Sequence, residues 1–355
     1  MSKAMIAMSG GVDSSVAAFL TLQQGYEVIG ATMKLFDKDD IGIQEKTCCS
    51  LDDVMDAKSV CARLGIDHYV FNMKDEFAAD VMRRFAETYR DGATPNPCID
   101  CNRYIKFGGL LRRAEQLDCD YIVTGHYASI EFDKTSGRYL LKKAADKAKD
   151  QTYFLYPLNQ HQLSKTLFPL GKLTKPEVRA IAESNQFINS RKHDSQDICF
   201  VPDGDYVKFL EGYFGETCPY GNFVDKDGNI IGQHKGTIRY TIGQRKGLGM
   251  GFNKPMYVCA KDVAKRTVTL GNNDDLFSTQ VNAADVTMIA YEKLDRPIRV
   301  TAKVRYSQRE ERAILEQIGD REIHLEFDNP QRAVAPGQAV VCYEDDVVVC
   351  GGTIV

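Results

Sequence analysis

The stretch that decides the fold lies near the N-terminus, where residues 4–19 have the sequence AMIAMSGGVDSSVAAF. Its first part, Ala4–Met8, is a short apolar run that suits a buried strand, and Val12–Gln24 has the pattern of a helix that ends before Gly25. A glycine-rich turn at the start of a helix offers backbone N–H groups and the positive end of the helix dipole to an anion. Residues Ser9–Ser15 therefore predict a phosphate-binding loop between the first strand and the first helix.

Within this loop, Gly10 and Gly11 would let the backbone approach a phosphate, the serines would add hydroxyl donors, and Asp13 could hold Mg²⁺. The chain has neither Gly-x-x-x-x-Gly-Lys-Ser/Thr nor a Gly-x-Gly-x-x-Gly pattern after a strand. A tight turn with a serine cap is the purely structural interpretation, and a lone Gly-Gly would favour it. The whole string, at the start of an α/β domain, favours phosphate binding.

The alternation of strand and helix continues through the first third of the chain and predicts a doubly wound parallel sheet. Further strands are predicted at Glu27–Met33, His68–Asn72 and Tyr121–Thr124, and further helices at Leu51–Leu64, Lys74–Tyr89 and Gly108–Leu117. Capping-box spacing at residues 174–177 starts another helix, which ends near Asn185.

The character of the sequence changes after about residue 210. Residues 221–265 are rich in glycine and short β-branched runs, and residues 298–355 have strand patterns throughout, with turn signals at Asp227-Gly228 and Pro336-Gly337. We therefore expect an α/β domain at residues 1–208, a small mixed domain at 209–278 and a C-terminal β-barrel at 279–355.

Composition narrows the class of protein. The 355 residues are 43% apolar and 26% charged, as in a globular protein of two or three domains. The run of about eighteen apolar residues that a membrane helix needs is missing, and no export signal is recognised. Eleven cysteines without an export signal indicate a reducing compartment, so we expect a cytoplasmic protein without wholesale disulfide bonding.

The charge distribution predicts a local contact with nucleic acid. A formal net charge of −4 argues against a generally basic nucleic-acid binder. Residues 228–261, however, contain no Asp or Glu and carry Lys235, Arg239, Arg245, Lys246, Lys254 and Lys261. Such a segment suits phosphate contacts, although a solvated basic face is the common alternative.

Two polar segments carry the cysteines that can do chemistry. We expect residues 94–102, with Cys98 and Cys101, to form a loop, because Pro95 and Pro97 disfavour a helix. Arg103 and Lys106 follow and would favour a Cys101 thiolate, while Cys199 follows the polar run 193–197. Cys98 and Cys101 could instead be half of a zinc site completed by Cys48, Cys49 or Cys199. The cysteines in apolar stretches are expected to lie in the core: Cys61, Cys119, Cys259, Cys342 and Cys350.

The Ser9–Ser15 loop resembles the PP-loop of the ATP pyrophosphatase superfamily, whose members transfer AMP to a carbonyl oxygen and then displace it with nitrogen or sulfur. More closely, the chain resembles the tRNA-specific 2-thiouridylase (MnmA) family over essentially its whole length. Besides Ser9–Ser15, the strings that carry this resemblance are Asn96-Pro97 with Cys101-Asn102, Thr124–Tyr127, Lys149–Gln151, Asp197–Phe200, Gly243–Leu248 and Pro336–Gln338.

The resemblance implies roles for individual residues. Cys199 would carry a persulfide and Cys101 would be its partner. Asn96, Pro97 and Cys98 would face the target base. ATP would be held by Ala7, Met8, Ser9, Gly10, Gly11, Val12, Asp13, Ser14, Met33 and Gly125. The contacts to tRNA would come from His126, Lys149, Asp150, Gln151, Arg305, Tyr306 and Gln338.

Cys98 departs from the family, in which many members have an acidic residue at this position. Cys98, Cys101 and Cys199 could converge as three thiolates around an iron–sulfur cluster that holds a free sulfide. Alternatively, Cys98 is a bystander or a resolving thiol. Both interpretations stay open at the level of sequence.

The implied reaction is ATP-dependent thiolation of the wobble uridine, position 34, in tRNAs for Lys, Glu and Gln. ATP with Mg²⁺ would adenylate the C2 carbonyl, and sulfur from a donor protein would replace AMP, leaving a Cys101–Cys199 disulfide. A nitrogen-transferring PP-loop ligase acting on a small metabolite is the main alternative. A non-catalytic RNA- or metal-binding protein is the alternative from another class.

Overall fold

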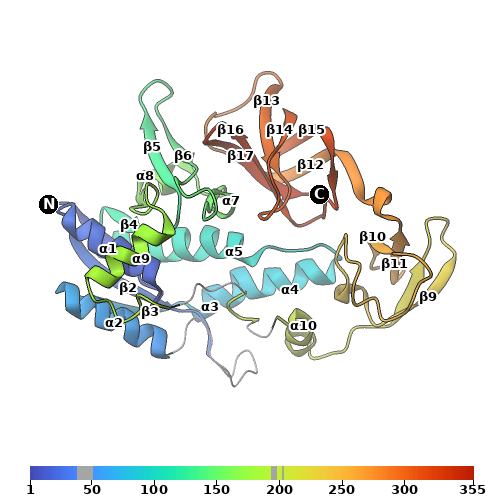
Figure 1. The fold of residues 1–355 in the computed structure, drawn as a ribbon, viewed down its shortest axis with the longest axis horizontal. Helices are drawn as coiled ribbons and strands as arrows, with labels where there is room; N and C mark the ends of the chain where they lie inside the picture. The colour runs from blue at the N-terminus through green and yellow to red at the C-terminus, as the bar shows by residue number, and fades with distance from the viewer. Residues whose placement is uncertain (38–50, 193–197, 202–203) are drawn as a thin grey trace.

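The computed structural model describes residues 1–37, 51–192, 198–201 and 204–355, and it has a parallel sheet at one end and two β-domains at the other (Figure 1). The first sheet has five strands in the order β3-β2-β1-β4-β7. Its strands are β1 (Lys3–Ala7), β2 (Glu27–Lys34), β3 (His68–Asn72), β4 (Tyr121–Val123) and β7 (Thr166–Leu167), all paired in parallel. The predicted parallel sheet is confirmed.

The side chains of β1 point alternately to the two faces of the sheet, and both faces are covered by a buried hydrophobic cluster. Met5 and Ala7 pack into one buried cluster, whereas Ala4 and Ile6 pack into a second one on the other face. The second cluster is completed by α1 (Val12–Gln23), α2 (Leu51–Leu64) and α9 (Lys175–Ser184). The sheet is therefore doubly wound, as predicted.

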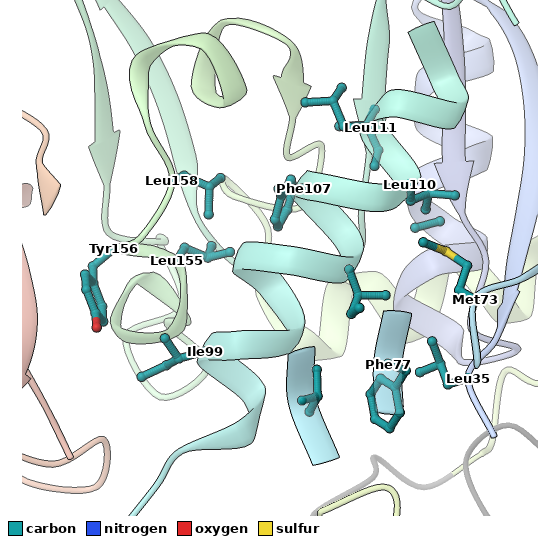
Figure 2. Packing of buried hydrophobic residues seen from close by; sticks show 14 of the residues in the cluster. Leu35, Met73, Phe77, Ile99, Phe107, Leu110, Leu111, Leu155, Tyr156 and Leu158 are labelled. Carbon is teal, nitrogen blue, oxygen red and sulfur yellow. The ribbon is translucent and has the colours of Figure 1, made fainter. Parts of the chain in front are cut away.

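The first cluster lies under a long helical layer. A continuous helical run consists of α3 (Lys74–Phe77), the π-helical segment η2 (Ala78–Met82) and α4 (Arg83–Arg90). Figure 2 shows Met73, Phe77 and Leu35 gathered on one side of the cluster, with Phe107, Leu155 and Leu158 on the other. The predicted helix Lys74–Tyr89 is thus present, with a π-helical turn inside it.

The expected loop at residues 94–102 is wrong from Pro97 onward. The structure has α5 (Pro97–Asp100), the π-helical η3 (Cys101–Leu110) and α6 (Leu111–Gln116) in one run. Pro97 lies in the first turn, where a missing N–H breaks no helical hydrogen bond and the fixed φ suits the helix. Cys98 and Cys101 are therefore presented by a helix.

The middle sheet has four strands in the order β10-β11-β8-β9. It follows α10 (Tyr206–Phe214) and contains β8 (Gly221–Val224), β9 (Ile230–His234), β10 (Tyr257–Asp262) and β11 (Thr267–Gly271). The β8 and β11 strands are parallel and the other pairs antiparallel, so the expected mixed character is confirmed. Gly228 has φ +86° in the predicted Asp227-Gly228 turn.

The C-terminal strands close into a barrel, as predicted. The order β12-β15-β14-β13-β16-β17 is completed by pairing between β12 and β17. A hairpin of the first domain, β5 (Ser129–Asp133) and β6 (Arg138–Lys142), joins β17 at Val347. The barrel strands are β12 (Phe277–Met288), β13 (Ile298–Lys303), β14 (Glu311–Gly319), β15 (Glu322–Arg332), β16 (Ala339–Glu344) and β17 (Val347–Ile354).

Two short helices, α7 (Thr152–Leu155) and α8 (Gln160–Ser164), lie between β6 and β7. The expected domain limits at 208/209 and 278/279 fall inside α10 and inside β12, and the three-part division stays a proposal. Across the described ranges, none of the helices has the length and apolar character to span a lipid bilayer. Of the cysteines expected in the core, Cys259 is half-buried and the others are buried: Cys61, Cys119, Cys342 and Cys350.

Candidate active site

The glycine-rich loop lies between β1 and α1. In the sheet, β1 has β2 on one side and β4 on the other, so the strand order changes direction at β1. Ligands of doubly wound sheets bind at such switch points. Gly10 has φ +72°, and a Cβ there would lie 2.4 Å from the carbonyl oxygen of Asp53, so the position requires glycine.

The start of α1 suits a phosphate. Gly11 is the N-cap residue and has no side chain to cap the helix, and the hydroxyls of Ser14 and Ser15 each donate to the Gly11 carbonyl at 3.0 Å. Uncapped N–H groups at a helix N-terminus attract anions. Gly125, after β4, packs against the same turn, because its Cβ would lie 2.6 Å from the carbonyl carbon of Asp13.

The loop is held from behind by residues that the sequence analysis missed. The Asn189 amide donates to the Gly10 carbonyl at 3.0 Å and to the Ser15 hydroxyl at 2.9 Å. The Lys192 ammonium lies 3.2 Å from the Gly10 carbonyl and pairs with Asp53 at 2.6 Å and Asp56 at 2.7 Å. These contacts tie the segment just before residues 193–197 to the phosphate-binding loop.

Asp13, the predicted Mg²⁺ ligand, has protein partners in the structure. Lys175 donates to its two carboxylate oxygens at 2.7 and 2.8 Å, and the Tyr127 hydroxyl donates at 2.9 Å. Lys175 is buried at the start of α9, where the helix dipole disfavours a cation. That unusual placement is the sequence signal that could have identified Lys175.

The two candidate catalytic cysteines pack against the same buried cluster. Cys101 is half-buried at the start of η3, and Cys98, one helical turn earlier, is exposed. Phe200 is buried beside Cys199 and contacts Phe85 and Phe209, with ring centroids 5.2 and 5.0 Å apart. The residues proposed between Lys192 and Ile198, including Asp197, lie outside the described residues.

The expectation that neighbouring cations favour a Cys101 thiolate is wrong in this structure. Burial raises the pKa of Cys101 to about 11, and the opposing influence of Lys106 is smaller. Arg103 points elsewhere, because it is ion-paired with Asp285 of the barrel. Burial also raises the pKa of Asp100 to about 6, against the lowering effect of Arg84 and Arg103.

Metal binding by the cysteines has no support in the arrangement of donors. Among the residues that the structure describes, no three His, Cys, Asp or Glu side chains lie close enough together to hold a metal ion. Cys98, Cys101 and Cys199 therefore do not form a preformed cluster site. Cys48 and Cys49, the other candidates for a zinc site, lie outside the described residues.

Most of the residues expected to contact tRNA have protein partners. His126 is buried, with Nδ1 2.7 Å from the Thr124 hydroxyl and Nε2 3.4 Å from Lys106. Asp150 is buried and accepts from the backbone of Ala144 at 3.0 Å. The remaining contacts are Gln151 with the backbone of Tyr127, Arg305 with the carbonyls of Ile242 and Ala333, and Gln338 with those of Thr94 and Pro95. Tyr306 is exposed at 38% and lies against Phe154, with ring centroids 4.4 Å apart.

The acid-free segment 228–261 lines a cavity of about 530 Å³ beside α10. Its walls include Lys235, Arg239, Tyr240 and Gln244. The expectation that Lys261 is one of the basic phosphate contacts is wrong, because its ammonium group is buried and burial lowers its pKa to about 8.

Three family models match the chain in order. They are described as the tRNA methyl transferase HUP domain over residues 2–203, the tRNA methyl transferase PRC-barrel domain over 207–272 and the aminomethyltransferase beta-barrel domain over 278–354. With the uncapped glycine-rich loop at the switch point of a parallel sheet, they define a PP-loop ATP-utilising protein with two appended β-domains.

Curated relatives match almost end to end. The chain is 49% identical over 352 residues to the tRNA-specific 2-thiouridylase MnmA of Clostridioides difficile, covering 99% of this chain and 98% of that protein. It is 50% identical over 354 residues to the MnmA of Acetivibrio thermocellus, covering 99% of each. A solved 4-thiouridine synthetase–RNA complex with bound ATP is 17% identical, with a TM-score of 0.39 over 59% of this chain and 50% of that chain. The chain belongs to the tRNA-specific 2-thiouridylase family, so the predicted resemblance is confirmed.

Proposed function

We propose that this protein is an ATP-dependent tRNA sulfurtransferase that converts the wobble uridine at position 34 to 2-thiouridine. The observation that carries the proposal is the connection between two parts of the site. Asn189 and Lys192 hold the Gly10 carbonyl of the ATP loop, and Cys199 follows them closely in the chain. The relatives named tRNA-specific 2-thiouridylase support the same reaction, and neither the nitrogen-transferring ligase nor the non-catalytic binder is favoured.

The first step uses the glycine-rich loop. The uridine O2 attacks the α-phosphorus of ATP and pyrophosphate leaves, which makes C2 electrophilic with AMP as the leaving group. The N–H groups at the start of α1 stabilise the phosphate charge, and Gly10 and Gly125 permit close packing against the backbones of Asp53 and Asp13, respectively. Mg²⁺ accompanies ATP and would neutralise part of that charge.

The second step transfers sulfur. A donor protein loads Cys199 as a persulfide, and the terminal sulfur attacks C2 as AMP departs. Attack of the Cys101 thiolate on the sulfur of Cys199 then releases 2-thiouridine and leaves a Cys101–Cys199 disulfide, which a two-electron reductant must reopen. Alternatively, Cys101 first frees hydrosulfide, which attacks C2; the same disulfide results.

Substrate recognition is assigned to the base-facing residues Asn96, Pro97 and Cys98 and to the basic segment 228–261. The acceptors proposed from the resemblance are tRNAs for Lys, Glu and Gln. Of the expected tRNA contacts, Tyr306 is the one whose side chain the fold leaves exposed. A tRNA substrate and eleven cysteines suit a cytoplasmic location.

The cluster mechanism suggested by Cys98 is the second candidate and has weaker support, because the described donors do not converge. Iron content and visible absorption of anaerobically purified protein test it. Stoichiometric iron, together with loss of thiolation in Cys98→Ser, would support the cluster mechanism, and a colourless, iron-free, fully active protein would exclude it.

Nucleoside mass spectrometry of tRNA incubated with protein, ATP and sulfide tests the function itself. Cys199→Ser should abolish 2-thiouridine formation in a persulfide-driven assay, yet keep tRNA-dependent pyrophosphate release. Normal thiolation by this variant would contradict the persulfide assignment. AMP formation that depends on ammonia or an amine, and not on RNA, would favour the ligase alternative.

A further inference from the structure

The segment that leads into the cysteine-bearing helix is attached to a turn of the C-terminal barrel. The backbone N–H of Thr94 donates to the carbonyl of Pro336 at 2.8 Å. The side-chain amide of Gln338 donates to the carbonyls of Thr94 at 2.9 Å and Pro95 at 3.2 Å. Residues 94 and 95 thus share three hydrogen bonds with the Pro336-Gly337-Gln338 turn, immediately before Asn96, Pro97 and Cys98.

The two backbones approach so closely that a side chain would not fit between them. Gly337 has φ +86°, and a Cβ there would lie 2.9 Å from the backbone nitrogen of Thr94 and 3.0 Å from the Cβ of Ala93. Pro336 also limits the freedom of the turn. The turn therefore has the shape of a rigid clamp on residues 93–95.

A second contact holds the other side of the same helix. Arg103, two residues after Cys101, is ion-paired with Asp285 of β12, and Asp285 also pairs with Arg321. The Arg103 side chain is 14% exposed, whereas the Asp285 side chain is 36% exposed, so the pair is partly shielded from solvent on the Arg103 side. The barrel consequently contacts the chain both before Cys98 and after Cys101.

The geometry also limits what Gln338 can offer to RNA. Both hydrogens of its amide nitrogen are directed to protein carbonyls, and its own backbone groups bond to Ala335 and Ile354. The remaining free group is the side-chain oxygen, which is an acceptor and a poor partner for a phosphate.

We propose that Gln338 is a positioning residue for sulfur transfer, and that the barrel turn 336–338 sets the placement of the Cys98–Cys101 helix. This inference rests on the proposed role of Cys101. Because Tyr306, one of the proposed tRNA contacts, belongs to the same barrel as the clamp, we expect a tRNA that displaces the turn to shift the cysteine helix as well.

The experiment compares Gln338→Ala and Gln338→Glu with Gln331→Ala. Gln331 is a matched control, since it is buried in the same barrel and bonds to Gln308 at 2.7 Å and to the Asn329 carbonyl at 2.7 Å. The first readout is the rate of Cys101 alkylation by iodoacetamide without tRNA or ATP, followed by peptide mass spectrometry. It needs no thiolation activity, so it tests the clamp even if the proposed reaction is wrong.

Cys101 should be alkylated several-fold faster in Gln338→Ala than in the wild type. The rate should be higher still in Gln338→Glu, because a carboxylate repels both carbonyls. Gln331→Ala should match the wild type. In thiolation assays, Gln338→Ala should lower kcat about tenfold, the scale of two lost hydrogen bonds, with the Kd for tRNA within about twofold. An unchanged alkylation rate combined with weakened tRNA binding would overturn the proposal and leave Gln338 as a tRNA contact.

Discussion

Lys175 donates to both carboxylate oxygens of Asp13, at 2.7 and 2.8 Å, so the acidic residue of the ATP loop is half of an ion pair. The pair joins α9 to the start of α1 and reduces the negative charge that an incoming triphosphate meets. Both the affinity for ATP and the stability of the domain should therefore depend on Lys175.

Lys175→Ala should lower ATP affinity at least tenfold and reduce the free energy of unfolding by about 1–3 kcal/mol, because it leaves a partly buried carboxylate beside the phosphates. Calorimetric ATP titration and denaturant unfolding measure the two effects. Asp13→Asn in the Lys175→Ala background should restore part of the ATP affinity, since it removes the uncompensated charge. The exposed Lys172→Ala is the control, and wild-type ATP affinity in Lys175→Ala would contradict the assignment.

Gly10→Ala should abolish measurable ATP binding and destabilise the protein more than Gly65→Ala. Both glycines have a left-handed φ, +72° and +69°, so both substitutions carry the backbone strain of about 1–2 kcal/mol. At Gly65 nothing lies within 4 Å of the new Cβ, whereas at Gly10 the Asp53 carbonyl lies 2.4 Å away. Comparable losses of stability in the two variants, with ATP binding intact in both, would show that the loop tolerates the side chain.

The alkylation rate of Cys101 should rise about tenfold per pH unit from pH 7 to 10, because only the thiolate reacts and burial raises the thiol pKa to about 11. Lys106→Ala should slow alkylation, since Lys106 lowers this pKa. In the unfolded chain the thiol ionises at lower pH, near 9. Ionisation of Cys101 should therefore lower the free energy of unfolding as the pH rises from about 9 to about 11. A rate that reaches its plateau by pH 9 would contradict the raised pKa.

Arg305→Ala should lower the thermal midpoint, whereas Arg309→Ala should leave it unchanged. Arg305 donates to the carbonyls of Ile242 at 3.1 Å and Ala333 at 2.6 Å, which joins the middle domain to the barrel, and its loss should remove about 1–3 kcal/mol of stability. Arg309 is exposed, so its removal should change the surface charge with little effect on packing. Scanning calorimetry and tRNA titration distinguish the two roles. Equal thermal midpoints in the two variants, with weaker tRNA binding in Arg305→Ala, would contradict the structural role and indicate that Arg305 contacts tRNA.

Local patterns in the sequence were sufficient for the class of fold and for the ATP loop. The apolar run at Ala4–Met8 and the glycine-rich turn after it depend on neighbouring residues, and the structure has a strand at Lys3–Ala7 and a helix that starts at Val12, as predicted. The error at Pro97 came from applying the helix-breaking property of proline to a first-turn position, where it does not hold.

By itself, the sequence determined that a glycine-rich loop at the start of a helix, cysteines in polar segments and a β-rich half occur in one chain, because each has a local signature. The tertiary structure alone decided how they are joined. Lys175 reaches Asp13 across 162 residues, Asp285 reaches Arg103 across 182, and Gln338 reaches Thr94 across 244. These pairings depend on how distant segments pack in the folded chain. Burial also raises the pKa of Cys101, and the residues next to Cys101 in the sequence do not reveal that burial.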